Sequence, residues 1–159
     1  MKNIRNKIFS TAGSWPATIS RLTLGFILLP HGAQKLLGLF GGMGFSHTMQ
    51  YFTDVVHLPW LIGFIVIMIE FFGSILLLLG WATRIVAALI IPLFIGIIIT
   101  HHWQAGFFMD WFGANPKGFE GFEFDLLMIG LAISLLVSGG GKFSVDQRYG
   151  NLQTNNPPI

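Results

Sequence analysis

The 159-residue chain is 53% hydrophobic but only 10% charged, whereas about 25% of the residues in an ordinary soluble domain are charged. Its formal net charge of +2 is too small to indicate a nucleic-acid partner. The absence of cysteine excludes disulfides, a nucleophilic thiol and thiolate-ligated iron–sulfur clusters. The apolar residues form long blocks, so the composition predicts an integral membrane protein in contact with the lipid bilayer.

Four apolar blocks predict four transmembrane helices and an all-α fold, because about 20 apolar residues cross the hydrocarbon layer. The blocks cover about residues 17–37, 59–79, 84–102 and 119–138. The connection between the second and third blocks is short, which is typical of an antiparallel helical pair. We therefore predict an antiparallel four-helix transmembrane bundle over residues 17–142. Residues 1–16 would form a cytoplasmic segment, and residues 143–159 a cytoplasmic tail that is disordered at its end.

The distribution of basic residues predicts the orientation of these helices. Positively charged residues gather on the cytoplasmic side of membrane proteins. One side of the predicted bundle holds Lys2, Arg5, Lys7, Arg21, Arg84, Lys142 and Arg148. The other side holds only Lys35 and Lys117. The sequence therefore predicts a multi-pass protein of the plasma (inner) membrane with both termini in the cytoplasm. In the first outer loop, Ser46 is a candidate N-cap that predicts a short interfacial helix.

Ionisable side chains inside the predicted spans are costly in a bilayer, so each of them indicates a partner or a function. Glu70 lies near the middle of the second span, and the polar residues of the first span share one helical face. The depths of these groups predict a polar pocket that opens toward the outer face. Glu70 and His31 are the candidate catalytic residues. The candidate ligand-binding residues are Lys35, Arg21, Arg84, His101, His102 and Glu123.

Four of these residues also have a structural interpretation. Glu70 could pair with Arg21 or Arg84 to hold the helices together, or be protonated and hydrogen-bonded between helices. The two arginines could instead extend toward the cytoplasmic interface. His31 could be a packing histidine.

The sequence contains no motif for covalent haem, an iron–sulfur cluster or a flavin. His101 and His102 are adjacent, so their rings would point about 100° apart on a regular helix and could not both face one ion. No metal site is predicted.

Five short elements, each different, follow one another along residues 21–146. They are Arg21-Leu22-x-Leu24-Gly25, His31-Gly32-x-x-Lys35, Glu70, Leu79-Gly80-x-x-Thr83-Arg84 and Gly139-x-Gly141-x-x-Ser144-x-Asp146. In order and spacing they resemble the DoxX family of small four-helix membrane proteins. The resemblance implies a four-helix bundle and an association with membrane oxidoreductase systems, among them a thiosulfate:quinone oxidoreductase. It also implies a shared polar set formed by Arg21, His31, Lys35, Glu70 and Arg84.

These observations predict a redox-linked membrane subunit that binds a quinone or a similar small redox molecule inside the bundle. His31 and Lys35 would donate hydrogen bonds to the ligand, and Glu70 would relay protons. The expected partners are soluble or membrane oxidoreductase subunits and further copies of the chain. Two other functions stay open: a non-catalytic anchor or assembly subunit, and a small-solute or proton-coupled transporter that uses Glu70 as its carrier. Whether the chain is itself an enzyme also stays open.

Overall fold

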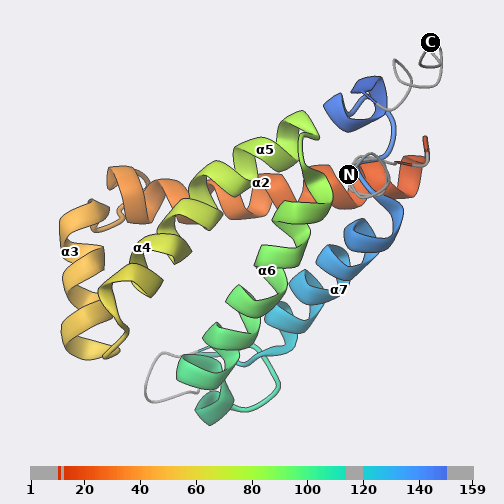
Figure 1. The fold of residues 1–159 in the computed structure, drawn as a ribbon. Helices are drawn as coiled ribbons and strands as arrows, with labels where there is room; N and C mark the ends of the chain where they lie inside the picture. Colours follow the sequence, from red (N-terminus) through yellow and green to blue (C-terminus); the bar gives the residue numbers. More distant parts are fainter. Residues whose placement is uncertain (1–10, 12, 114–119, 150–159) are drawn as a thin grey trace.

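The structure is a computed structural model that describes residue 11, residues 13–113 and residues 120–149. Within this part of the chain the regular structure is all helical and contains no strand (Figure 1). The α-helices are α2 (Trp15–Leu37), α3 (Gly44–Gln50), α4 (Trp60–Met68), α5 (Ser74–Leu79), α6 (Thr83–Ile97) and α7 (Glu123–Ser138). The all-α prediction is confirmed for these residues. Most of the predicted N-terminal segment (residues 1–10 and 12) and the end of the predicted tail (150–159) lie outside the described residues.

Three π-helical stretches, in which the backbone hydrogen bonds span one residue more than in an α-helix, interrupt or extend these helices. They are Tyr51–Val55 after α3, Ile69–Gly73 between α4 and α5, and Ile98–His102 after α6. The helical path is therefore continuous over Trp60–Leu79 and over Thr83–Ala105. Among the described helices, these two are long and apolar enough to cross a membrane by length and composition.

The other two predicted spans coincide with α2 and α7. α2 has 23 residues but carries three basic or imidazole side chains, and α7 has 16 residues. α3 confirms a helix in the first long connection. However, α3 begins at Gly44 and has no side-chain cap. The prediction that Ser46 caps it is wrong, because Ser46 lies inside the first turn.

The helices form two arms that meet at one end of the molecule and diverge toward the other (Figure 1). α2 packs along α4 and α5 in one arm, and α6 packs along α7 in the other. Gly32 allows the close packing of the first arm, because a Cβ at this position would lie 2.5 Å from the backbone nitrogen of Phe71. The π-helical stretch that carries Glu70 is thereby held directly against α2.

Apolar side chains fill the region between the arms where they meet. Leu24, Leu77, Ile90, Met128 and Leu135 are fully buried there. Many other large apolar side chains lie exposed on the outside of the helices. Examples are Phe26, Phe72, Ile99 and Val137. Such an extensive apolar surface is suited to contact with lipid rather than with water.

A network of hydrogen bonds to the backbone fixes the end where the arms meet. The buried guanidinium of Arg21 donates to the carbonyls of Leu77 (2.6 Å) and Leu78 (2.7 Å) at the end of α5, and to that of Gly140 (2.8 Å). Arg21 thereby ties α2 to the end of α5 and to the segment after α7.

Asp146 caps the other side of the same junction. Its carboxylate accepts hydrogen bonds from the backbone N–H of Ala82 (2.8 Å) and of Thr83 (2.9 Å) at the start of α6. Its own N–H donates to the carbonyl of Gly80 at 3.0 Å. A helix N-terminus favours a negative charge, so this buried carboxylate stabilises the beginning of α6. The segment after α7 is thus attached to the turn that joins the arms.

Candidate functional site

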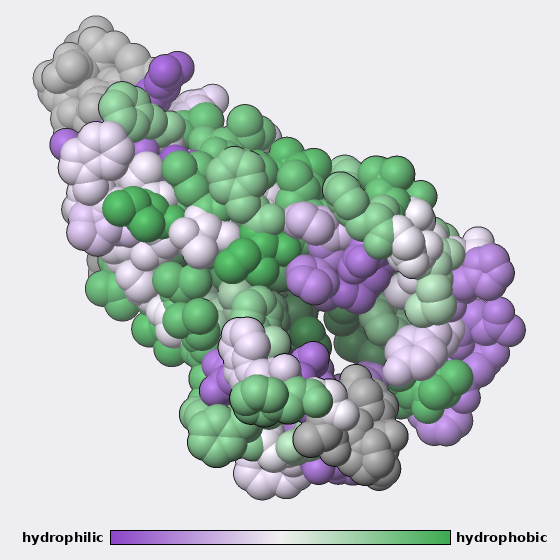
Figure 2. All heavy atoms as spheres, turned by 180° about the vertical axis from the view of Figure 1, so that it is seen from behind, coloured by the Kyte–Doolittle hydropathy of each residue, from purple (hydrophilic) through white to green (hydrophobic). Residues whose placement is uncertain are grey.

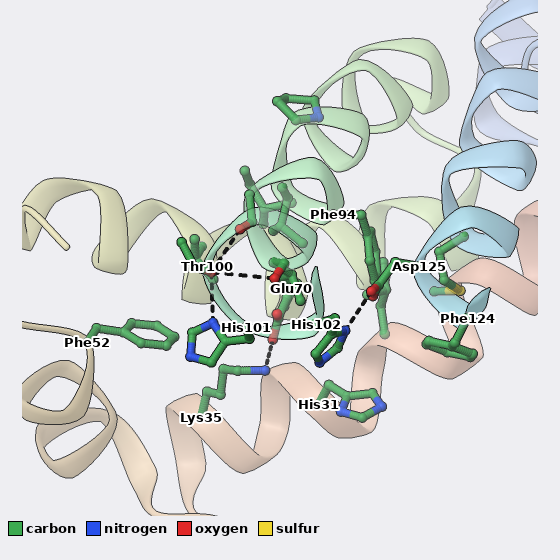
Figure 3. A pocket seen from close by; sticks show the side chains of 18 of the residues that line it. His31, Lys35, Phe52, Glu70, Phe94, Thr100, His101, His102, Phe124 and Asp125 are labelled. Atoms are coloured by element: carbon green, nitrogen blue, oxygen red, sulfur yellow. Dashed lines mark hydrogen bonds and ion pairs between the residues drawn. The ribbon is translucent and has the colours of Figure 1, made fainter. Parts of the chain in front are cut away.

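A cavity of about 820 Å³ lies between the two diverging arms. Its volume falls in the range of about 300–1,000 Å³ that is typical of small-molecule sites. Apolar side chains make up most of its wall, among them Leu28, Ile62, Val66, Leu93 and Met128. Figure 2 shows the surface hollowed between the arms, with hydrophilic residues gathered beside the hollow. The polar groups of the wall come from several helices (Figure 3).

Lys35 and Glu70 form an ion pair in this wall. The Nζ of Lys35 donates to Oε2 of Glu70 at 2.5 Å. The side chain of Glu70 is only 4% exposed, whereas that of Lys35 is 28% exposed. The pair bridges α2 and the π-helical stretch Ile69–Gly73, at the level where Gly32 brings these segments together. His31 lies one helical turn before Lys35 and lines the same cavity.

The partner of Glu70 is therefore Lys35. The structural interpretation of the sequence, which paired Glu70 with Arg21 or Arg84, is wrong. The two arginines lie near the junction of the arms. There they contact backbone carbonyls of α5, α7 and the segment after α7.

A second ion pair joins the two chain segments on the other side of the cavity. Nδ1 of His102, at the end of the π-helical stretch that follows α6, lies 2.6 Å from Oδ2 of Asp125 on α7. Both residues line the cavity, and Asp125 is 1% exposed. This contact occupies Nδ1 of His102 and leaves Nε2 as the ring nitrogen that can meet a ligand.

Asp125 was not among the residues singled out from the sequence, although a signal for it exists. The buried residues of α7 are Asp125, Met128, Ala132 and Leu135, and this spacing follows one face of a helix. An acidic residue in phase with three apolar residues that face the core is a candidate for a buried functional carboxylate.

His101 belongs to a third polar contact of the cavity. The hydroxyl of Tyr51 lies 3.3 Å from its Nε2, and the hydroxyl of Thr100 lies 2.7 Å from its Nδ1. All three residues line the cavity. Tyr51 thereby links the segment after α3 to the end of α6. Both nitrogens of the imidazole have partners within the chain, so His101 is a less suitable ligand donor than His102.

All three π-helical stretches of the described chain contribute side chains to this cavity. Tyr51 and Phe52 come from the first, Ile69 and Glu70 from the second, and Thr100, His101 and His102 from the third. A π-helical turn redirects side chains relative to a regular helix and occurs frequently at functional sites. It also explains how adjacent histidines take different partners around one cavity. Residue spacing in the sequence did not indicate these stretches.

Three of the predicted ligand-binding residues do not line the cavity. Arg21 contacts the backbone at the junction of the arms, and Arg84 donates to the carbonyl of Leu136 on α7. Oε1 of Glu123 accepts from the backbone N–H of Met109 at 3.0 Å and from Nε1 of Trp111 at 3.3 Å. Each of these side chains forms hydrogen bonds with groups at a helix end or in a loop. His31, Lys35, Glu70, His101 and His102 do line the cavity, and their binding and catalytic roles stay predictions.

The apolar surface, the two spanning-length helices and the internal cavity together define a helical membrane protein with a small-molecule pocket. The chain belongs to the DoxX family, whose profile matches residues 17–103. It is 32% identical over 126 residues to "Putative oxidoreductase CatD" of Bacillus subtilis, an alignment that covers 79% of this chain and 81% of that protein. It is 28% identical over 149 residues to "Inner membrane protein YphA" of Escherichia coli, covering 93% of this chain and all of that protein. No solved structure matches the chain.

Proposed function

We propose that this protein is the quinone-binding membrane subunit of a redox system. The observation that carries the proposal is one cavity that combines an apolar wall with two hydrogen-bonded polar pairs, Lys35–Glu70 and His102–Asp125. The relative from Bacillus subtilis is named as an oxidoreductase, which supports a redox role for this chain as well.

The lining of the cavity fits the chemistry of a quinone. A quinone needs an apolar slot for its flat ring and a hydrogen-bond donor for each of its two carbonyl oxygens, where it takes up electrons and protons. Phe94 and Met128 contribute to the apolar wall, and Nζ of Lys35 is the donor for one carbonyl. The imidazole of His102 meets the other carbonyl, to which Nε2 donates when both ring nitrogens carry a proton. The electrons come from a partner oxidoreductase subunit, because the chain has no cysteine and no cofactor motif of its own.

Glu70 and Asp125 serve proton transfer, and they do not bind the quinone ring directly. Each carboxylate holds its partner side chain at a fixed position, so that a further polar group of the partner can point into the cavity. Each carboxylate can also pass a proton from the surface to its partner after that partner has given a proton to the reduced quinone. His31 extends the path from Lys35 toward the surface, since it is exposed and lines the same cavity.

The membrane topology that fits this function has four passes. α2 spans about 35 Å at roughly 1.5 Å per residue, which is enough to cross the hydrocarbon layer. Its exposed residues include Ile19 and Phe26, and those of α7 include Ile133 and Val137. Together with the asymmetry of basic residues, these faces support four antiparallel spans with both termini in the cytoplasm. The cavity then lies in the outer half of the bilayer.

Direct analysis of bound lipid tests the proposal. The intact protein is extracted into polymer-bounded discs of native lipid, and the quinone content per chain is measured by solvent extraction and chromatography. The variants are Lys35→Met, Glu70→Gln and His102→Gln. Two matched controls are Lys142→Met and His47→Gln, because both residues lie outside the cavity lining and His47 is exposed.

We expect quinone enriched in the wild-type protein above the surrounding lipid and retained in both controls. Each cavity variant should lose about tenfold or more in affinity, the loss that follows from one hydrogen bond to a charged group. Wild-type protein that carries no quinone, and binds none when quinone is added, would refute the proposal. If such protein also co-purifies with other subunits, the function as an assembly subunit takes its place.

A further inference from the structure

The wall of the cavity is incomplete between α4 and α6. Ile62 and Ile65 of α4 and Leu89 of α6 line the cavity, yet they are 46%, 40% and 45% exposed. Pro92, one turn after Leu89, is also exposed and also lines the cavity. α4 and α6 lie in different arms and diverge from the turn that joins them (Figure 1). We call the opening bounded by Ile62, Ile65, Leu89 and Pro92 the lateral gap.

The side chains around the lateral gap are suited to hydrocarbon rather than to water. α4 and α6 belong to the two helices that are long and apolar enough to cross a membrane. Only 33% of the most apolar window of each helix is buried within the protein. The four side chains that bound the gap have no polar group. A water-soluble ligand gains nothing from such a border, whereas an alkyl or isoprenoid chain is stabilised by it.

The polar groups of the cavity occupy only part of its wall. Lys35 and His102 come from the far ends of their helices relative to the junction of the arms, Glu70 comes from the middle of the helical path Trp60–Leu79, and much of the remaining wall is apolar. A single quinone ring would fill only a fraction of about 820 Å³. The rest of the volume is continuous with the lateral gap and has the chemistry of a site for a hydrocarbon chain.

We propose that the ligand enters sideways from the bilayer through the lateral gap, and that its long hydrocarbon tail stays in the gap while its head group reaches the ion pairs. This inference rests on the proposed function for the identity of the head group. It adds the substrate class, a membrane-dissolved quinone with a tail, and it excludes a tailless, water-soluble quinone as the preferred ligand.

Two glycines make the proposal testable with a matched control. Gly96 lies on α6 one turn beyond Pro92 and lines the cavity, and a Cβ at this position would meet nothing within 4 Å. Gly130 lies on α7, outside the cavity lining, and a Cβ there would also meet nothing within 4 Å. A side chain added at Gly96 therefore takes up open space beside the cavity wall, one turn from the residue Pro92 that bounds the gap, whereas the same side chain at Gly130 lies outside the cavity lining.

The absence of native cysteine allows the gap to be blocked after folding. Gly96→Cys and Gly130→Cys proteins are purified in detergent, and each is modified with a benzyl methanethiosulfonate reagent that a reductant later removes. The probes are a benzoquinone and a naphthoquinone, each with and without a decyl tail. Binding of all four probes is measured before modification, after it, and after reduction.

We expect modified Gly96→Cys to bind the tailed quinone about tenfold or more weakly, the affinity that roughly two buried methylene groups supply. Binding of the tailless ring should change less than about twofold, and reduction should restore the tailed quinone. Modified Gly130→Cys should bind all probes as before. Equal effects on tailed and tailless probes, or no effect at Gly96, would overturn the lateral gap while leaving the quinone site intact. If wild-type protein binds no probe of either ring type, the proposed function itself fails and the inference fails with it.

Discussion

Removing the ammonium of Lys35 should destabilise the protein through the carboxylate that remains. Glu70 is 4% exposed in the pair, and its oxygen accepts from Nζ of Lys35 at 2.5 Å. Breaking one half of a buried ion pair costs about 3–5 kcal/mol, because the other charge is left uncompensated. Lys35 itself is 28% exposed, so part of the cost is screened by solvent. We expect Lys35→Met to lower the free energy of unfolding by about 3 kcal/mol.

A double variant separates the cost of leaving the charge of Glu70 uncompensated from the cost of lost packing. In Lys35→Met/Glu70→Leu both charges are gone, and such replacements by apolar residues are often neutral. We expect the double variant to recover to within about 1 kcal/mol of the wild type, and therefore to be more stable than Lys35→Met alone. Lys142→Met is the control, since Lys142 lies over the ring of Trp15 and outside the cavity.

Unfolding is measured by titrating dodecylmaltoside micelles with sodium dodecyl sulfate, followed by tryptophan fluorescence and circular dichroism. The reasoning is refuted if Lys35→Met unfolds at the same detergent fraction as the wild type. It is equally refuted if the double variant is no more stable than the single one. Either result would mean that Glu70 does not depend on Lys35 for its charge compensation.

Three further predictions concern the framework around the cavity. Asp146→Ala should lower the free energy of unfolding by about 2–4 kcal/mol, because two backbone donors lose a charged acceptor; a loss below about 0.5 kcal/mol in the same titration would contradict the cap. Gly32→Val should destabilise the protein and reduce bound quinone, because its side chain would collide with the backbone of Phe71; unchanged thermal unfolding and quinone content would argue against this contact. Cysteine at Ser46 should react with an impermeant thiol reagent in intact cells, whereas cysteine at Trp81 should react only after permeabilisation; the reverse pattern would invert the topology.

The residues of the first arm were predictable from the sequence because regular helical geometry governs them. His31 and Lys35 lie one turn apart on α2, and their face meets the helix that carries Glu70. A charged residue far from both ends of an apolar segment has to find a partner within the bundle. Depth alone did not identify which cation this would be. That choice depends on the close approach at Gly32, which brings the C-terminal half of α2 against the π-helical stretch.

The second arm was less predictable, for two physical reasons. The π-helical stretch Ile98–His102 shifts the direction of both histidines, so the angle expected for a regular helix does not apply to them. The partner of His102 is Asp125, which lies beyond a segment whose aromatic and glycine residues give no periodic signal. Glu123, chosen from its depth, instead holds the loop through Met109 and Trp111.

The motifs that carry the family resemblance serve two separate regions of the molecule. Arg21 and Asp146 fix the junction from which the arms diverge, and Lys35 and Glu70 supply one polar pair of the cavity. The second pair is only half inside the region that the DoxX profile matches, since residues 17–103 include His102 but not Asp125. The matched region therefore includes Arg21, Lys35 and Glu70, but neither Asp146 of the junction nor Asp125 of the second pair. The ligand is defined by both pairs together with the apolar wall between them, so its identity has to be established from this cavity rather than from the family.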